Sequence, residues 1–172
     1  MTTTTQCREC EQEVSANARS CPHCGAPFPS NPDWKGWGYE YKSPATYLGY
    51  PLVHIAIGRD ASGKLRVAKG VIAIGQFAIG AITIAQFGVG FLFGLGQFMF
   101  GLTAIAQFAI GLYFAVGQFA AGYIAIGQFA LGYYALAQIG YAHHLWTGSH
   151  RDPAAVELFT RLVEKIGIHP RK

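Results

Sequence analysis

The chain carries no charged residue between positions 70 and 150, although it has 172 residues and a formal net charge of +4. Globular surfaces normally contain many Lys, Arg, Asp and Glu side chains, so this stretch is not an ordinary water-facing surface. Its high content of apolar residues also excludes disorder, which requires low hydrophobicity. We therefore expect an ordered region whose side chains are hidden from water or meet lipid.

Motifs for catalysis and export are missing as well. The sequence contains no phosphate loop, dinucleotide fingerprint or nucleophile elbow. His143, His144 and His150 have no His-Glu-x-x-His spacing, and the uncharged stretch offers no Asp, Glu or Lys for acid–base chemistry. The first residues also lack the charged and apolar regions of a signal peptide. We predict a protein that is not an enzyme and not secreted, in the cytoplasm or at the cytoplasmic face of a membrane.

All four cysteines lie near the amino end, in two C-x2-C pairs separated by ten residues. Each pair lets a tight turn aim two sulfurs at one point, and two such turns supply the tetrahedral four-thiolate shell of structural Zn²⁺. Two disulfides are the alternative, but they require an oxidising compartment. The spacing predicts one structural zinc ion, with no open position for catalysis. Its ligands are Cys7, Cys10, Cys21 and Cys24.

The sequence around these ligands reads Cys7-Arg-Glu-Cys10 and Cys21-Pro-His-Cys-Gly-Ala-Pro-Phe28. It resembles the short zinc ribbon at the start of many bacterial proteins, over about 25 residues. Glu11 stands where that ribbon usually has glycine after the first pair. The resemblance implies an interaction module and hence a protein partner. Residues 1–42 have a net charge of −1, which disfavours nucleic acid as that partner.

Composition divides the rest of the chain into three segments. Residues 29–38 are rich in proline and polar residues, which is typical of a linker. Residues 39–150 form the predicted apolar repeat domain. Within it, 52–58 and 65–69 flank a Ser-Gly centre and predict a β-hairpin. Because Ile55-Ala56-Ile57-Gly58-Arg59 follows the template of the later repeats, we interpret this hairpin as an atypical first repeat.

A glutamine marks each later repeat. The intervals between successive glutamines are 10, 11, 10, 11, 10 and 10 residues, and all but the last glutamine precede phenylalanine. We refer to these residues as the glutamine series: Gln76, Gln86, Gln97, Gln107, Gln118, Gln128 and Gln138. Stacked repeats would align these amides in a ladder.

The repeat favours strands over helices. Residues 70–140 contain fourteen glycines, each costing roughly 1 kcal/mol in a helix interior, among many β-branched and aromatic residues. Both alternating sides are apolar, so both must be covered or meet lipid. The competing interpretation is a polytopic helical membrane protein with three spans of about 20 residues. No polar loop or basic residue within the stretch supports those spans.

The segments Leu48-Gly-Tyr-Pro-Leu-Val-His-Ile-Ala-Ile-Gly58 and Arg66-Val-Ala-Lys-Gly-Val-Ile-Ala-Ile-Gly75 carry a second resemblance. Together with the following repeats they resemble a bacterial group of uncharacterised Gly/Ile repeat proteins associated with the β-flower fold. The resemblance implies a shallow barrel and no established activity. The predicted fold class is all-β, with a repeat domain that is either such a barrel or a β-solenoid.

The carboxyl-terminal segment 151–172 predicts an amphipathic helix. Asp152 suits the N-cap and Pro153 the first helical position, and Gly167 is a plausible end. We expect this helix to dock on the repeat domain and cover an exposed edge. An interfacial membrane helix is the alternative.

Together these patterns predict a non-enzymatic protein whose repeat domain associates with a membrane or with an apolar ligand such as lipid. The ribbon would serve as its interaction module. The alternatives are a self-assembling scaffold, because unprotected strand edges can stack, and the polytopic helical protein.

Overall fold

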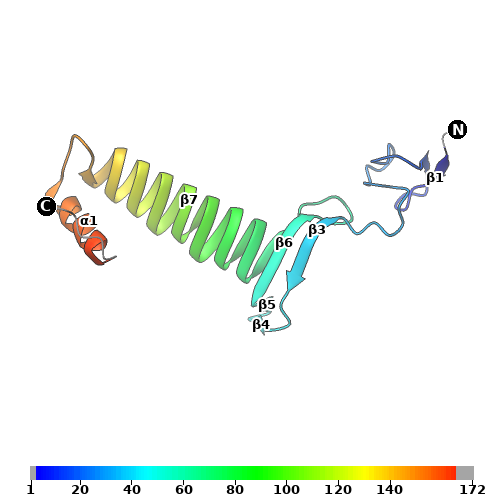
Figure 1. Ribbon diagram of the computed structural model, residues 1–172, viewed down its shortest axis with the longest axis horizontal. Helices are drawn as coiled ribbons and strands as arrows, with labels where there is room; N and C mark the ends of the chain where they lie inside the picture. Colours follow the sequence, from blue (N-terminus) through cyan, green and yellow to red (C-terminus); the bar gives the residue numbers. More distant parts are fainter. Residues whose placement is uncertain (1–2, 166–172) are drawn as a thin grey trace.

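The computed structural model describes residues 3–165 and consists mainly of strands, with one short helix near the carboxyl end (Figure 1). The two-residue strands β4 and β5 form a small hairpin. The elements are β1 (Thr4–Gln6), β2 (Glu13–Ser15), β3 (Trp37–Lys42), β4 (Thr46–Tyr47), β5 (Tyr50–Pro51), β6 (Val53–Arg59), β7 (Val67–Trp146) and α1 (Pro153–Lys165).

The cysteine-containing segment is a small unit built on the antiparallel pair β1–β2. Arg8 links this unit to the rest of the chain, because its guanidinium donates to the carbonyl of Ala61 at 2.7 Å. Ala61 lies in the loop between β6 and β7. Strand β3 begins at Trp37, within the segment predicted as a linker.

Strand β6 joins the entry strand to the long apolar region. It pairs antiparallel with β3 and parallel with β7, where Val53 opposes Ile72. The predicted hairpin is therefore wrong for most of its length: only the bridge between Arg59 and Leu65 is antiparallel. After this short antiparallel bridge the chain enters β7, which runs parallel to β6 where the two strands pair.

Strand β7 winds as one continuous spiral ribbon (Figure 1). Residues one repeat apart are neighbours on successive turns, as the stacked rings of Phe98, Phe108 and Phe119 show, with centroids 4.5 and 4.3 Å apart. We call β7 the coil. Residues 3–165 contain no closed barrel, so the predicted shallow barrel is not observed. In this same part of the chain, no helix combines the length and apolar character that crossing a membrane requires.

The interior of the coil is lined mainly by alanine and glycine. A buried residue recurs about every five positions, which is half a turn, and Met99 and Thr83 are the large exceptions. Two backbone segments face each other so closely that larger side chains have no room. The fully buried alanines of this row include Ala73, Ala104, Ala109, Ala115, Ala120, Ala125, Ala130 and Ala135.

A second row of small residues lies where successive turns touch. A Cβ built on Gly101 would lie 1.9 Å from the carbonyl oxygen of Gly90, and one on Gly117 would lie 2.0 Å from that of Ala106. Such distances are far below van der Waals contact. The glycines of the repeat therefore permit the stacking of one turn on the next.

Helix α1 docks on the last turns of the coil, as predicted. Phe159 and Ala155 are buried against Ile124, with Phe114 and Tyr134 packed around them. The predicted helix end at Gly167 lies outside the described residues.

Asp152 caps α1 and joins it to His144 of the coil. Its carboxylate accepts from the N–H groups of Ala154 and Ala155 at 2.9 and 3.2 Å, and lies 3.0 Å from Nδ1 of His144. Burial, the largest effect, raises the pKa of Asp152, but the hydrogen bonds from Ala155, His144 and Ala154 outweigh it and the net pKa is lowered. The stabilisation is present above the ordinary value of 3.8 and is lost as the pH falls through the lower folded pKa.

We expect amide hydrogen exchange across α1 to accelerate as the pH is lowered below that ordinary value, after correction for the intrinsic exchange rate. Asp152→Asn should keep a capping acceptor and lose this pH dependence, whereas Asp152→Ala should weaken protection at neutral pH too. Unchanged protection in Asp152→Ala would contradict the assigned role.

Candidate metal centre and apolar surfaces

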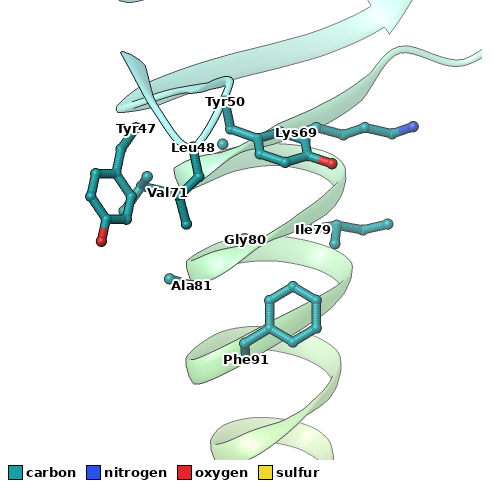
Figure 2. A pocket seen from close by; sticks show the side chains of 10 residues that line it. Tyr47, Leu48, Tyr50, Lys69, Val71, Ile79, Gly80, Ala81 and Phe91 are labelled. Carbon is teal, nitrogen blue, oxygen red and sulfur yellow. The ribbon is translucent and has the colours of Figure 1, made fainter. Parts of the chain in front are cut away.

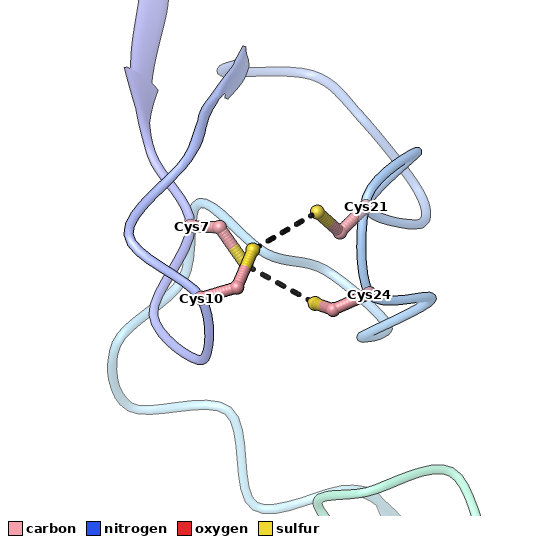
Figure 3. Close-up of side chains that lie close together, drawn as sticks. All are labelled: Cys7, Cys10, Cys21 and Cys24. Carbon is pink, nitrogen blue, oxygen red and sulfur yellow. Dashed lines mark hydrogen bonds between the residues drawn. The ribbon is translucent and has the colours of Figure 1, made fainter.

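The four cysteines converge on one point (Figure 3). Their sulfur atoms all lie within 4.8 Å of one another, and all four are free thiols. The shortest separations cross between the two pairs: Cys7 to Cys24 is 3.8 Å and Cys10 to Cys21 is 3.7 Å. A tetrahedral shell with metal–sulfur bonds of about 2.3 Å places its sulfurs ~3.8 Å apart. The predicted ligands therefore form a group that could hold a metal ion.

Two equivalent backbone turns position these sulfurs. The N–H of Glu11 donates to the carbonyl of Cys7, and that of Gly25 donates to the carbonyl of Cys21, each at 2.9 Å. Both donors have a left-handed backbone, with φ of 59° at Glu11 and 77° at Gly25. Glycine adopts this conformation without strain and glutamate does not. The glycine missing at position 11 is thus replaced by a strained residue in the same conformation.

Crowding of the sulfur atoms gives Cys21 and Cys10 different pKa values. Burial, the largest effect, raises the pKa of Cys21, but N–H donors of Cys24 and His23 and the neighbouring thiols outweigh it and lower the pKa to about 6. At Cys10 the N–H of Gln12 favours the thiolate. Burial and hydrogen bonds with the other three thiols outweigh this donor and raise the pKa of Cys10 to about 12.

Glu11→Gly is expected to stabilise this unit by about 1 kcal/mol, the cost of a left-handed non-glycine residue. Retention of metal against increasing chelator, measured on the full chain, reports this gain. Glu9→Gly is the matched control, because Glu9 is an exposed residue of the same turn without a positive φ. If both variants held metal equally well, strain at Glu11 would not limit the unit.

A polar cluster joins β3 to the start of the coil. The buried Nδ1 of His54 accepts from the N–H of Lys69 at 2.8 Å, and its Nε2 lies 3.4 Å from Glu40. Glu40 also bonds Arg66 and lies 3.0 Å from Nζ of Lys42. The hydrogen bond from Lys42, followed by the charges of Lys42 and Arg66, lowers the pKa of Glu40. His54 is a structural histidine, as its apolar surroundings in the sequence indicate.

Sequence reasoning missed the contribution of Glu40 to this cluster. The antiparallel register of β3 with β6, in which Lys42 opposes His54, creates it. In the sequence, the only available signal was that β3 and β6 both have the alternating pattern of strands that could pair.

An apolar cleft of about 450 Å³ opens where the hairpin β4–β5 overhangs the first turns of the coil (Figure 2). Tyr47, Leu48 and Tyr50 come from the hairpin, and Ile79 and Phe91 from the coil. Lys69 extends outward at its upper rim (Figure 2). The cleft can accommodate an apolar chain, with hydroxyl groups and one ammonium group at its mouth.

His143 and His144 contact groups other than a metal cluster. His143 stacks on Tyr133 with ring centroids 4.9 Å apart, and His144 faces Asp152. Within residues 3–165, the cysteine group is the only cluster of metal-binding side chains with three or more members.

Comparison of the chain with protein-family models, with curated proteins and with solved structures gave no match.

The outward side chains of the coil are apolar and exposed along its length. Leu112 is 65% exposed, Phe91 63% and Phe129 53%, although the interior is already filled by alanine. The structure thus offers two candidate sites, a cysteine cluster and an uncovered apolar coil.

Proposed function

We propose that this protein is a non-enzymatic adaptor that holds a zinc ribbon at a lipid membrane. The coil, a β-solenoid, associates with lipid, and the ribbon binds a protein partner. The observation that carries the proposal is the apolar outward side of the coil. Its residues are exposed, and the uncharged stretch contains no charged side chain that would favour water.

Zinc is the metal that best fits the cysteine cluster. Four thiolates in tetrahedral separation are typical of structural Zn²⁺, and free thiols suit the reducing cytoplasm. Because four protein ligands fill the shell, the ion would fold and stiffen the ribbon without taking part in a reaction. The exposed surface around Cys24 and His23 is then the part of the ribbon available to a protein partner.

Flotation with liposomes tests the membrane proposal. The full chain is mixed with vesicles of neutral and anionic phospholipid and centrifuged through a density gradient. We expect it to move upward with the lipid and to stay with it in high salt, because apolar contact is not screened. Recovery of the whole sample as a soluble monomer below the lipid would rule the proposal out.

A self-assembling scaffold is the second candidate function, favoured by the same exposed side chains. It predicts particles that grow with protein concentration when lipid is absent. Light scattering over a concentration series in a mild detergent distinguishes the two functions. The particle size should grow with concentration for a scaffold and stay small for a lipid-binding adaptor.

A further inference from the structure

The surface of the coil has an unequal distribution of polar groups around its circumference. Inward alanines are about five residues apart, which is half a turn. Each turn of the coil therefore has two flat faces, one around each inward alanine, and two edges between them. Side chains that flank Ala115 and Ala125 lie on one face, and those that flank Ala120 and Ala130 lie on the opposite one. Around one turn the order is Tyr113 on one edge, Phe114 and Val116 on the first face, Gln118 on the other edge, and Phe119 and Ala121 on the second face.

Helix α1 packs on the first face, so the charged side chains of α1 lie on this side of the coil. Phe159 packs on Ile124 of this face, and the opposite side of the helix bears Glu157 and Arg161. These two side chains form an ion pair at 2.6 Å and are 62% and 72% exposed. We call this the helix face.

The second face is apolar along the whole coil, and among the described residues only the hairpin β4–β5 overhangs it, near Ile79. One column consists of stacked phenylalanines, and the column beside it contains Ile79, Phe100 and Leu131, which are 40–45% exposed. We call this the phenylalanine face. Its first column is Phe77, Phe87, Phe98, Phe108, Phe119 and Phe129.

Both edges of the phenylalanine face carry polar groups, among which Lys69 is charged. The glutamine series follows one edge, where every member after Gln76 is exposed. Tyr113, Tyr123, Tyr133 and His143 stack along the carboxyl-terminal half of the other edge, with successive centroids 6.1, 5.2 and 4.9 Å apart. The cleft with Tyr47, Tyr50 and Lys69 lies at the amino-terminal half of that edge. Tyrosine and amide groups of this kind are suited to the interface between lipid and water.

We propose that the coil lies flat on a bilayer, with the phenylalanine face among the acyl chains, both edges at the headgroups, and α1 facing water. This orientation rests on the proposed membrane association and specifies which surface makes it. A coil standing upright across the bilayer would place Glu157 and Arg161 beside lipid, since α1 packs over turns as far back as Phe114.

The size of the phenylalanine face argues for lipid over a second copy of the chain. Six turns of about 4.8 Å and a width of roughly 11 Å give about 320 Å² per partner. A stable dimer usually buries about 800 Å² on each partner. A bilayer does not need a matched partner surface and adapts to the length of the face. Residues 43–69, with a net charge of +3, lie at one end and favour anionic headgroups.

Two matched lysine substitutions test the orientation. Phe98 on the phenylalanine face and Ile84 on the helix face are 41% and 42% exposed, and both point outward in the uncovered half of the coil. We expect Phe98→Lys to weaken binding of the full chain to phosphatidylcholine–phosphatidylglycerol vesicles by about tenfold or more. Ile84→Lys should change it less than about threefold. Far-UV circular dichroism should give the wild-type spectrum for both variants, so that a loss of binding is not a loss of fold.

Polarised infrared spectroscopy of the wild-type chain on oriented bilayers gives an independent measurement. Hydrogen bonds between turns direct the carbonyls along the coil axis, so a flat coil places the amide I transition in the membrane plane. A transition along the membrane normal would overturn the orientation, as would equal weakening by the two lysines. A stable dimer lost only in Phe98→Lys, with no effect of that lysine on vesicle binding, would assign the face to a second copy instead. If the wild type binds no vesicles at all, the proposed function itself fails.

Discussion

Replacing Cys7 by serine is expected to abolish zinc binding and unfold the ribbon while leaving the coil intact. Cys7 is only 1% exposed, and its sulfur lies 3.8 Å from that of Cys24 across the cluster. Structural zinc contributes an apparent free energy of about 10–16 kcal/mol to domains of this size. The apolar core of the ribbon is too small to replace that contribution, since it contains little besides Val14 and Ala26 with the cysteines.

Metal analysis and hydrogen exchange together measure this effect. The zinc content should fall from one ion per chain to a small fraction, and exchange should accelerate across residues 4–28 but not across β7. His23→Ala is the matched control, because His23 lies between two ligands and is exposed. A Cys7→Ser chain that kept equimolar zinc and its exchange protection would show that the cluster does not hold the ribbon together.

The cysteine cluster was predictable because its chemistry is local in the sequence. Two C-x2-C turns supply all four ligands, and no long-range contact has to be known. The backbone conformation at Glu11 was predictable only in part. The missing glycine indicates the position, but only the structure shows that glutamate there keeps the left-handed conformation.

The strand character of the repeat was predictable from its glycines and β-branched residues, but the geometry of the coil was not. The alternation of residues in the repeat indicates a strand with two sides, but it does not indicate which side faces the interior of the coil. The small size of Ala73 and Ala78 was the available signal for an interior too narrow for isoleucine. The first pairing was also missed: the repeat template aligns Gly58 with Gly75, whereas Ala56 opposes Gly75 in the structure.

The alternation of 10- and 11-residue intervals has a local cause that the sequence did not indicate. The extra residue enters between Gly88 and Gly94, and again between Ala109 and Ala115, where inward positions are six apart instead of five. In both places the chain makes a tight turn at a glycine. A Cβ on Gly90 would lie 2.2 Å from the carbonyl oxygen of Phe93. The longer intervals therefore come from one additional residue at each of these two turns.

Replacing Gly101 by alanine should destabilise the coil by more than about 3 kcal/mol, beyond the usual cost of overpacking. The new methyl group would lie 1.9 Å from the carbonyl oxygen of Gly90 and 3.0 Å from its carbonyl carbon. Neither atom belongs to a flexible side chain, so relief requires that two turns of backbone separate. Their hydrogen bonds would then break next to an apolar environment, where lost partners cost most.

Gly148→Ala is the matched control, because a Cβ at that position meets no atom within 4 Å. Denaturant unfolding in mild detergent, monitored by far-UV circular dichroism, should give an unchanged midpoint for Gly148→Ala and a much lower one for Gly101→Ala. Equal midpoints would mean that successive turns are not stacked at the observed separation. Because both faces and both edges of the coil depend on that stacking, the same result would also remove the basis for a flat apolar surface that meets lipid.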